Sequence, residues 1–185
     1  MFQGNLIRET DTYELQLNVN NGQRLTIIVE SLGRINFGGG IKDFKGIIGD
    51  VTINGQAVSD VDVTSYPLND ISNVYNCLET NCLEGRDDGY LFYSGEFTLP
   101  QASDLLIDLS PLTKGVAFVN EFNPGRYWPV RKGNIPSQTQ LYIPASVLRG
   151  SPGRNNIILL EEFSKDEQVT LNYSYYSART DSTQQ

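Results

Sequence analysis

A guanidinium group beside two aromatic rings is the combination of side chains in this chain best suited to binding a small molecule. Arg126, Tyr127 and Trp128 follow one another directly, and Asn123 lies shortly before them. The CH face of a pyranose ring stacks on Trp, and its hydroxyl groups accept hydrogen bonds from Arg. These four residues therefore form a candidate carbohydrate-binding site. In the competing and favoured interpretation, Trp128 closes a hydrophobic core and Arg126 binds nearby carbonyl groups or a carboxylate, because large aromatic side chains usually bury.

A short apolar run leads into this candidate site. Residues 116–119, Val-Ala-Phe-Val, include two β-branched side chains and are too few for a stable helix, so they predict a buried strand. Asn123-Pro124-Gly125 is typical of a turn, because Asn tolerates unusual dihedral angles, Pro fixes φ and Gly permits a positive φ. We therefore expect the chain to reverse at residues 123–125, just before the aromatic pair.

Short strands are predicted along the rest of the chain as well. Residues 13–30 predict a hairpin that turns at Asn20-Asn21-Gly22, and Asn54-Gly55 predicts a second, two-residue hairpin. The remaining predicted elements are strands at 90–99, 105–109, 141–143, 157–160 and 169–175, and one helical turn at 144–150. About ten short strands with almost no helix indicate an all-β sandwich of the jelly-roll type.

The two cysteines lie in a polar stretch, residues 68–88, which predicts a long surface loop. Cys77 and Cys82 are spaced to close a small loop, and we predict a disulfide that stabilises the fold by about 2 kcal/mol. Two free thiols are the alternative. A metal site is the weakest of the three interpretations, because the chain has no His and two sulfur ligands leave a zinc ion half-coordinated.

Net charge limits the kinds of partner. The chain has 14 Lys and Arg against 22 Asp and Glu, a formal net charge of −8, which argues against nucleic acid and anionic membranes as partners. No apolar run approaches the roughly 20 residues of a membrane span, and the first residues lack the pattern of a signal peptide. Asn172-Tyr173-Ser174 is a glycosylation sequon, so Asn172 is a candidate glycosylation site.

The sequence contains few of the residue patterns that are typical of catalytic sites. The absence of His excludes a Ser-His-Asp triad, and no glycine-rich phosphate-binding loop leads into a long helix. The acidic pairs Asp60/Asp62 and Asp87-Asp88 are typical of a solvated surface. We therefore assign no catalytic residue, no cofactor and no metal, and a structural calcium ion stays unassigned.

Several segments in the same order resemble the C-terminal β-domains of family 35 glycoside hydrolases, the β-galactosidases. The segments are VESLGRINFG at 29–38, DFKGI at 43–47, FVNEFNPGRYW at 118–128, LYIP at 141–144 and NIILLEE at 156–162. Glu121 and Pro124 stand where the family pattern has Gly and Leu.

The resemblance implies a galactose-binding-domain-like jelly roll at residues 59–177, preceded by the C-terminal part of another β-domain at 1–58 and followed by a polar tail at 178–185. It also implies a secreted or lysosomal protein. In the family, catalysis uses two glutamates on a β/α barrel, and the alternating strand and helix pattern of such a barrel is missing here. Strands of residues 1–58 are expected to lack pairing partners, so the chain is expected to need the rest of the enzyme.

The residues and the resemblance together allow three interpretations of the function of this chain. The leading one is a non-catalytic portion of a β-galactosidase that supports a catalytic barrel held on another segment. The second is a free galactose-binding lectin that uses the four candidate residues. The third is a structural or interaction protein that kept the fold and lost sugar chemistry, which the two departures from the family pattern favour. The fold alone does not separate the three.

Overall fold

The computed structural model describes residues 14–17, 20, 22, 25–30, 36–42, 46–79, 90–129, 138–163 and 168–177. The chain divides into two compact units, a first unit of Phe2–Pro67 and a second unit of Leu68–Gln185. The sequence placed this division near Val58. Residues 59–67 belong to the first unit by their contacts, so the observed division lies later in the chain.

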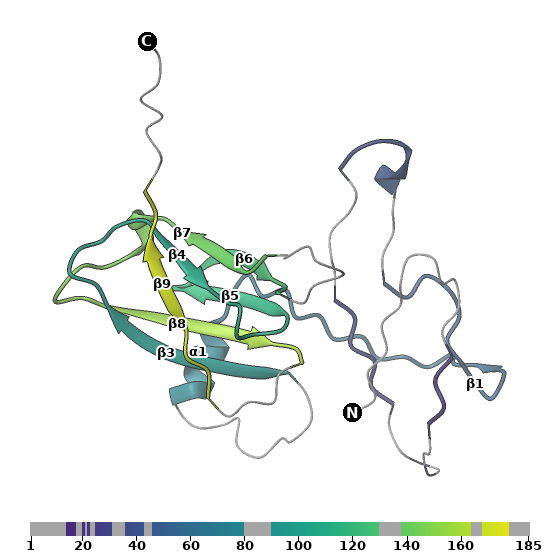
Figure 1. Ribbon diagram of the computed structural model, residues 1–185. Helices are drawn as coiled ribbons and strands as arrows, with labels where there is room; N and C mark the ends of the chain where they lie inside the picture. The colour runs from purple at the N-terminus through teal and green to yellow at the C-terminus, as the bar shows by residue number, and fades with distance from the viewer. Residues whose placement is uncertain are drawn as a thin grey trace. The chain divides into compact units, whose positions relative to one another are not determined.

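The second unit is a sandwich of two antiparallel sheets (Figure 1). One sheet has the strand order β3-β8-β5-β6 and the other has the order β7-β4-β9. The strands are β3 (Leu91–Thr98), β4 (Leu105–Asp108), β5 (Gly115–Val119), β6 (Phe122–Tyr127), β7 (Gln140–Ile143), β8 (Arg154–Glu161) and β9 (Asn172–Tyr175). The predicted all-β fold is confirmed, and so are the predicted strands at 90–99, 105–109, 116–119, 141–143 and 157–160.

Alternating side chains from both sheets form the core between them. In β4, Leu105 and Ile107 are buried while the residues between and after them are half-buried. The same cluster takes Ala117 and Val119 from β5 and Leu159 from β8. Each fully buried aliphatic side chain of this kind stabilises the fold by roughly 1.5–3 kcal/mol, so burial on one face of each strand sets its register.

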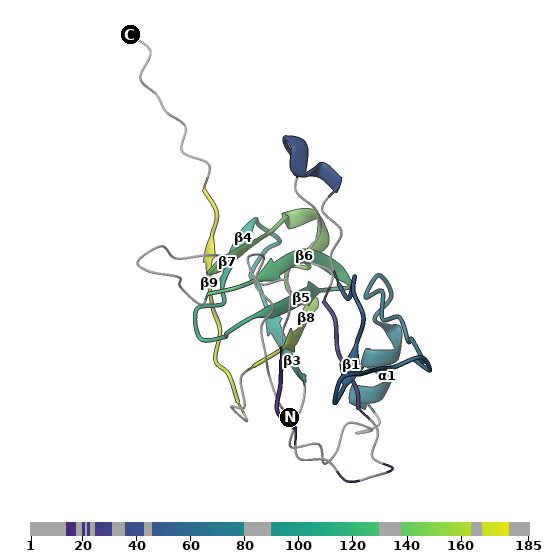
Figure 2. The ribbon, with the colours of Figure 1, turned by 90° about the vertical axis from the view of Figure 1, so that its right-hand side faces the viewer.

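A helix, α1 (Ser72–Glu79), covers the outer face of the four-stranded sheet and adds a third layer (Figure 2). Ile71 packs there against Phe118 and Ile158, with Val74 and Tyr75 beside them. This corrects the prediction of a loop at 68–88. Ile71, Val74 and Tyr75 have i, i+3, i+4 spacing, which places them on one helix face. The polar residues around them made this stretch look like a loop.

The hairpin between β5 and β6 turns at Asn120 and Glu121, which have φ angles of 47° and 69°. This corrects the prediction of a reversal at 123–125. Two successive positive φ angles are typical of the two-residue turn that matches the twist of paired strands. Pro124 and Gly125 lie inside β6, and Pro is tolerated there because β6 is an edge strand.

A short 3-10 helix, η2 (Ala145–Val147), follows β7. Pro144 precedes its first residue, as expected for the predicted helical turn, and Leu148 rather than Gly150 ends it.

The first unit contains one described hairpin, β1 (Thr52–Ile53) with β2 (Gln56–Ala57), and a 3-10 helix, η1 (Gly39–Lys42). Asn54 and Gly55 turn the hairpin with φ angles of 52° and 77°, which confirms the predicted two-residue turn.

The predicted hairpin at 13–30 is not found in the described residues of this range. Residues 14–17 and 25–30 form no strand, and the apolar side chains Leu25, Ile27, Ile28 and Val29 are 46–53% exposed. Alternating hydrophobicity alone does not make a strand, because its backbone groups need a partner strand and its apolar face needs a covering layer.

Candidate functional site

The four candidate residues lie on or directly after β6, but their side chains do not converge. Tyr127 is paired with Gly115, and its side chain is fully buried in the sandwich core. Arg126 is paired with Val116, which packs on the outer face of the same sheet, so Arg126 faces away from Tyr127. The prediction that Tyr127 contacts a sugar is therefore wrong, because a residue with 0% exposure offers no face for stacking.

The hydroxyl group of Tyr127 lies close to two acceptors on β8. It is 2.9 Å from the carbonyl oxygen of Leu160 and 3.2 Å from Oε2 of Glu161. Burial, and then the negative charge of Glu161, raise the pKa of Tyr127 far above its ordinary value. A Cβ atom added at Gly115 would lie 2.6 Å from this hydroxyl group, so Gly115 leaves the space that the Tyr127 ring needs.

Glu161 is a fully buried acceptor for several backbone and side-chain donors. It accepts hydrogen bonds from the backbone of Thr113 (3.1 Å), Lys114 (3.4 Å) and Phe163 (3.0 Å). The hydroxyl group of Thr113 also donates to Oε1 of Glu161. Buried charged groups are tolerated when hydrogen bonds satisfy them in this way, so Glu161 holds the ends of β5 and β8 together.

Three strand ends meet beside this carboxylate and form what we call the rim cluster, namely Lys114, Trp128, Glu162 and Phe163. Lys114 precedes β5, Trp128 follows β6 and Glu162 follows β8, and the registers of these strands bring the three ends together. The ammonium group of Lys114 lies 2.6 Å from Oε2 of Glu162. It also lies 5.2 Å from the centre of the Trp128 ring and 5.7 Å from that of Phe163, distances at which a cation is attracted to an aromatic face.

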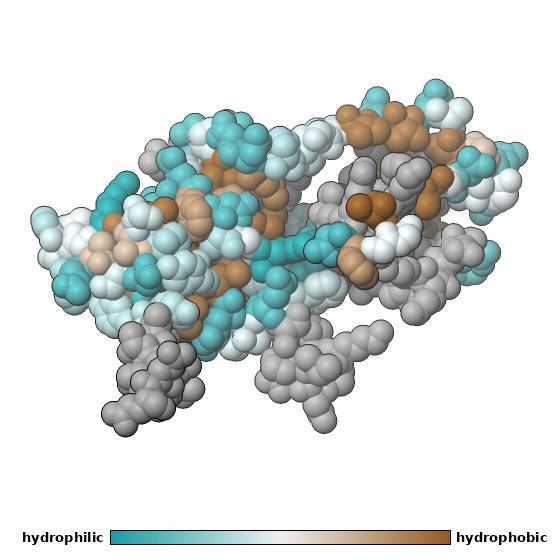
Figure 3. All heavy atoms as spheres, turned by 90° about the horizontal axis from the view of Figure 1, so that it is seen from above, coloured by the Kyte–Doolittle hydropathy of each residue, from teal (hydrophilic) through white to brown (hydrophobic). Residues whose placement is uncertain are grey.

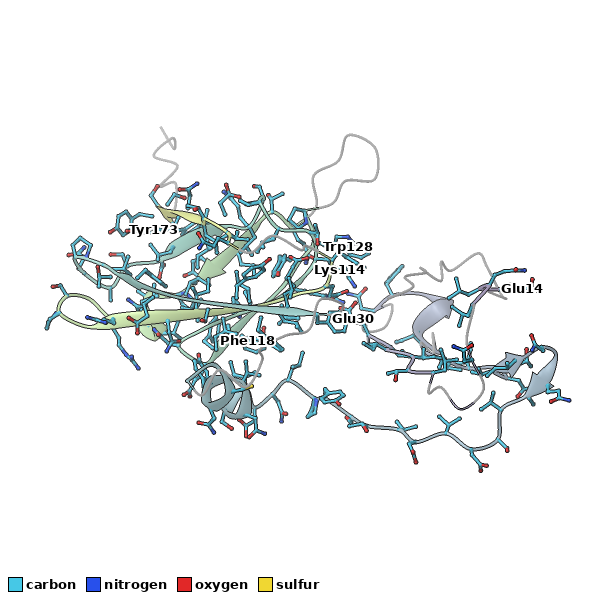
Figure 4. The ribbon with its side chains drawn as sticks, turned by 90° about the horizontal axis from the view of Figure 1, so that it is seen from below. Glu14, Glu30, Lys114, Phe118, Trp128 and Tyr173 are labelled. Carbon is cyan, nitrogen blue, oxygen red and sulfur yellow. The ribbon has the colours of Figure 1, made fainter. Side chains whose placement is uncertain are left out.

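Trp128 lies at the rim of the sandwich and does not close its core. Its side chain is 39% exposed, and Figure 4 shows it next to Lys114 at one end of the second unit. The favoured prediction for Trp128 is therefore corrected: the ring packs on a buried ammonium group and keeps part of its surface in solvent. The reason is that β6 ends at Tyr127, so the residue after it no longer lies between the sheets.

The other two candidate residues occupy separate positions. Asn123 is exposed, and its Oδ1 atom accepts a hydrogen bond from the backbone of Gly125 at 2.9 Å, which stabilises a local Asx turn. Arg126 is half-buried on the outward side of β6. The structure therefore leaves Trp128, with its rim-cluster neighbours, as the candidate residue best placed for stacking.

The sequence did not single out a second polar network, formed by Asn120, Asn155 and Asn156. The amide of Asn120 donates to Asn155 (2.8 Å) and to the carbonyl oxygen of Val147 (2.7 Å), and the backbone of Asn156 donates to Asn120 (3.0 Å). These bonds fix the β5–β6 turn against the start of β8. The signal that could have revealed the network is a pair of Asn residues before an apolar strand, which need buried partners.

The remaining predicted sites are distributed as follows. Cys77 lies half-buried in α1 and is disulfide-bonded; its predicted partner, Cys82, lies outside the described residues, so their pairing stays a prediction. Asn172 is exposed in β9. Asp60 and Asp62 are exposed, and Asp87 and Asp88 lie outside the described residues.

The described part of the chain contains no group of three or more His, Cys, Asp or Glu side chains placed to hold a metal ion. The same residues include no helix of the length and apolarity that a membrane crossing requires.

Both units match domain families of known proteins. Residues 1–69 match the family described as "Beta-galactosidase, first all-beta domain", and residues 90–155 match "Beta-galactosidase, galactose-binding domain". The β-galactosidase of Mus musculus is 34% identical over 91% of this chain, and that of Bos taurus is 34% identical over 86%. Beta-galactosidase 8 of Oryza sativa subsp. japonica is 33% identical over 84% of the chain.

The matches cover a limited part of those relatives. The chain spans 28% of the mouse protein and 26% of both the bovine and the rice proteins. Residues 1–69 and 90–155 thus carry, in this order, a first all-β domain and a galactose-binding domain of the β-galactosidase type, and the chain corresponds to a β-domain portion of a β-galactosidase.

Proposed function

We propose that the chain is a non-catalytic part of a family 35 β-galactosidase, an enzyme that cleaves terminal β-D-galactosyl residues, and that it supports a catalytic barrel carried on another segment. The observation behind this proposal is the match of two β-domain families in sequence order, in a chain that spans about a quarter of its relatives. We assign the protein to a secreted or lysosomal location from the family resemblance.

The two buried carboxylates of the second unit support a non-catalytic role. Retaining glycosidases use two carboxyl groups about 5–5.5 Å apart that both reach the substrate. In the second unit, Glu161 is fully buried and holds backbone donors, and Glu162 is bound to Lys114 with little exposure. Neither group has an open face for a sugar.

The apolar surface of the first unit supports the need for another segment. Leu25, Ile27, Ile28 and Val29 are about half exposed, and Ile48 is 78% exposed. Figure 3 shows hydrophobic residues gathered on the surface of this unit. Contiguous exposed apolar side chains mark surfaces that another element covers, and further β-strands of the enzyme are the occupant that the domain match favours.

Two measurements test the proposal. The purified chain is expected to release no product from a chromogenic β-galactoside, and a pull-down from the native source is expected to recover a segment that carries a catalytic barrel. Turnover by the isolated chain above a heat-inactivated control would contradict the non-catalytic role. Recovery of the chain without any barrel-bearing segment would contradict the supporting role.

Binding of a galactoside at the rim cluster is a second candidate function. The Trp128 ring packs on the Lys114 ammonium group and still leaves 39% of its side chain exposed. A single stacked ring with a few hydrogen bonds can reach a dissociation constant of about 1 mM, or roughly −4 kcal/mol. Calorimetry with a β-galactoside is expected to show binding that Trp128→Ala abolishes while the far-ultraviolet circular dichroism is unchanged. Tyr142→Ala is the matched control, because Tyr142 is similarly exposed, at 44%, on the other sheet.

The same calorimetric titration separates the two candidate functions. Absence of heat with the wild-type chain would eliminate rim binding and leave the supporting role intact. Equal loss of binding in Trp128→Ala and Tyr142→Ala would place the sugar elsewhere.

A further inference from the structure

Among the described strands, β9 (Asn172–Tyr175) lies at the edge of the three-stranded sheet. In the three-stranded sheet it pairs with β4, and within the described residues no strand pairs with its other side. All four of its residues are exposed. An edge strand presents a row of unpaired backbone N–H and C=O groups that can template pairing with another chain.

The composition of this edge makes such pairing a hazard. Residues 168–177 read QVTLNYSYYS and contain no charged residue, no Pro and no Gly. Natural edge strands are usually protected by Lys, by Pro or by a bulge, and uncharged β-branched and aromatic segments are the ones that aggregate. Residues 168–177 therefore contain no charged residue and no Pro that would protect this edge from pairing.

The tyrosines of this edge point to the inner side of the sheet and remain about half exposed there, Tyr173 at 44% and Tyr175 at 51%. Tyr173 is paired with Ile107 and Tyr175 with Leu105, both core residues, so the two rings face the inner side of the sheet. The Tyr173 ring centre lies 6.2 Å from that of Phe97 and 6.0 Å from that of Tyr175. Protection of the edge must therefore come from an outward position.

Asn172 is such an outward position. It is paired with Asp108, which follows the core residue Ile107, so Asn172 and Asp108 face the outer side of the sheet. Asn172 is exposed, and Ser174 two residues later completes the only Asn-x-Ser/Thr triplet of the chain. A group attached at Asn172 would extend into solvent without displacing any core side chain.

We propose that Asn172 carries an N-linked oligosaccharide and that this oligosaccharide covers the free edge of β9. In the transfer step, Nδ2 of Asn172 forms a bond to C1 of the first sugar of a lipid-linked oligosaccharide. The bond from C1 to the lipid pyrophosphate breaks, the lipid pyrophosphate leaves and the amide nitrogen loses one proton. A hydrated, branched glycan beside the edge prevents a second strand from approaching to the 4.7–4.9 Å spacing that pairing needs.

Occupancy is tested by expressing the full chain behind a cleavable secretion signal in a eukaryotic host. Treatment with peptide N-glycosidase is expected to lower the mass of the wild-type chain and of Ser174→Thr, which keeps the triplet. Asn172→Gln and Ser174→Ala are expected to show no shift. A wild-type chain that reaches the secretory pathway without a glycosidase-sensitive shift would overturn the proposal.

Edge protection is tested on the same material by light scattering and thioflavin fluorescence over time. Asn172→Gln, which lacks both the glycan and a charge at this position, is expected to associate at least several-fold faster than the glycosylated chain. Asn172→Lys also lacks the glycan, but places a charge at the edge, and is expected to associate as slowly as the glycosylated chain. Equal rates for Asn172→Gln and the glycosylated chain, or rapid association of Asn172→Lys, would overturn the protective role. Neither outcome bears on the proposed supporting function, which depends on the galactosidase assays.

Discussion

The ammonium nitrogen of Lys114 lies 2.6 Å from Oε2 of Glu162, and both side chains are less than a tenth exposed. This ion pair joins the residue before β5 to the residue after β8, and the Trp128 ring lies over the same ammonium group. A charge pair of this kind has lost most of its hydration, so each partner depends on the other.

Removing one partner of this pair is expected to destabilise the second unit strongly. Glu162→Gln and Lys114→Met are each expected to lower the free energy of unfolding by about 3–5 kcal/mol, because each removes the oppositely charged neighbour of a buried charge. The double variant Lys114→Met/Glu162→Leu is expected to lose less unfolding free energy than either single variant, because it removes both charges. Urea denaturation followed by the fluorescence of Trp128, the only Trp of the chain, measures all three.

The chain supplies a matched control for this prediction. Arg154 and Glu96 form an ion pair at 3.0 Å whose side chains are 73% and 63% exposed. Arg154→Ala is expected to change the unfolding free energy by no more than about 1 kcal/mol. A loss as large as that of the buried pair would show that charge alone, and not burial, governs these interactions.

Tyr127 is expected to make the second unit sensitive to alkali. Its pKa is raised in the folded state by burial and by Glu161, so above about pH 10, the ordinary Tyr pKa, the unfolded chain releases a proton that the folded chain keeps. Stability is therefore complete below pH 10 and falls by about 1.4 kcal/mol per pH unit above it. The difference in this slope between wild type and Tyr127→Phe isolates the contribution of this hydroxyl group.

The Tyr127→Phe variant has a further expected effect at neutral pH. The substitution removes the hydroxyl donor that lies near the carbonyl oxygen of Leu160 and the carboxylate of Glu161. The free energy of unfolding is therefore expected to fall by about 1–3 kcal/mol at pH 7. Identical alkaline slopes in the two proteins would contradict the buried, protonated state of Tyr127.

The all-β sandwich and most of its strands could be predicted, because buried faces impose a period of two on the sequence. The helix α1 could not, since its apolar residues are interrupted by Asn and Ser side chains that are typical of loops. The first unit shows the opposite error: the apolar residues of 25–30 have strand spacing but no paired partner among the described residues. Local pattern gives a preference, and tertiary partners decide whether it is realised.

The candidate site was only partly predictable for a similar reason. The sequence grouped Arg126, Tyr127 and Trp128 by adjacency, but successive residues of a strand point to opposite faces. The buried partners of Tyr127 lie more than thirty positions later, at Leu160 and Glu161, and no local pattern specifies such a pairing.

The turn between β5 and β6 offers a stabilising substitution. Glu121 has a φ of 69°, a conformation that costs a residue with a Cβ atom about 1 kcal/mol and costs Gly little. Glu121→Gly is expected to raise the unfolding free energy by several tenths of a kcal/mol to about 1 kcal/mol. Asn120→Gly is the contrasting variant, because Asn120 also has a positive φ but its amide binds Val147 and Asn155. A gain in stability in both variants would show that the Asn120 hydrogen bonds contribute little.

Gly115 is expected to tolerate no side chain. A Cβ atom at this position would lie 1.7 Å from the carbonyl oxygen of Leu160, and that oxygen belongs to the backbone of the paired strand β8 and cannot move aside without opening the sheet. Gly115→Ala is therefore expected to cost more than about 4 kcal/mol or to prevent folding. Gly95→Ala, also within the four-stranded sheet, would meet only Cγ2 of Ile157 at 3.6 Å, an ordinary contact, and is expected to fold normally. Circular dichroism of the two variants under identical conditions makes the comparison, and a stable, folded Gly115→Ala chain would contradict the observed register of β5 with β8.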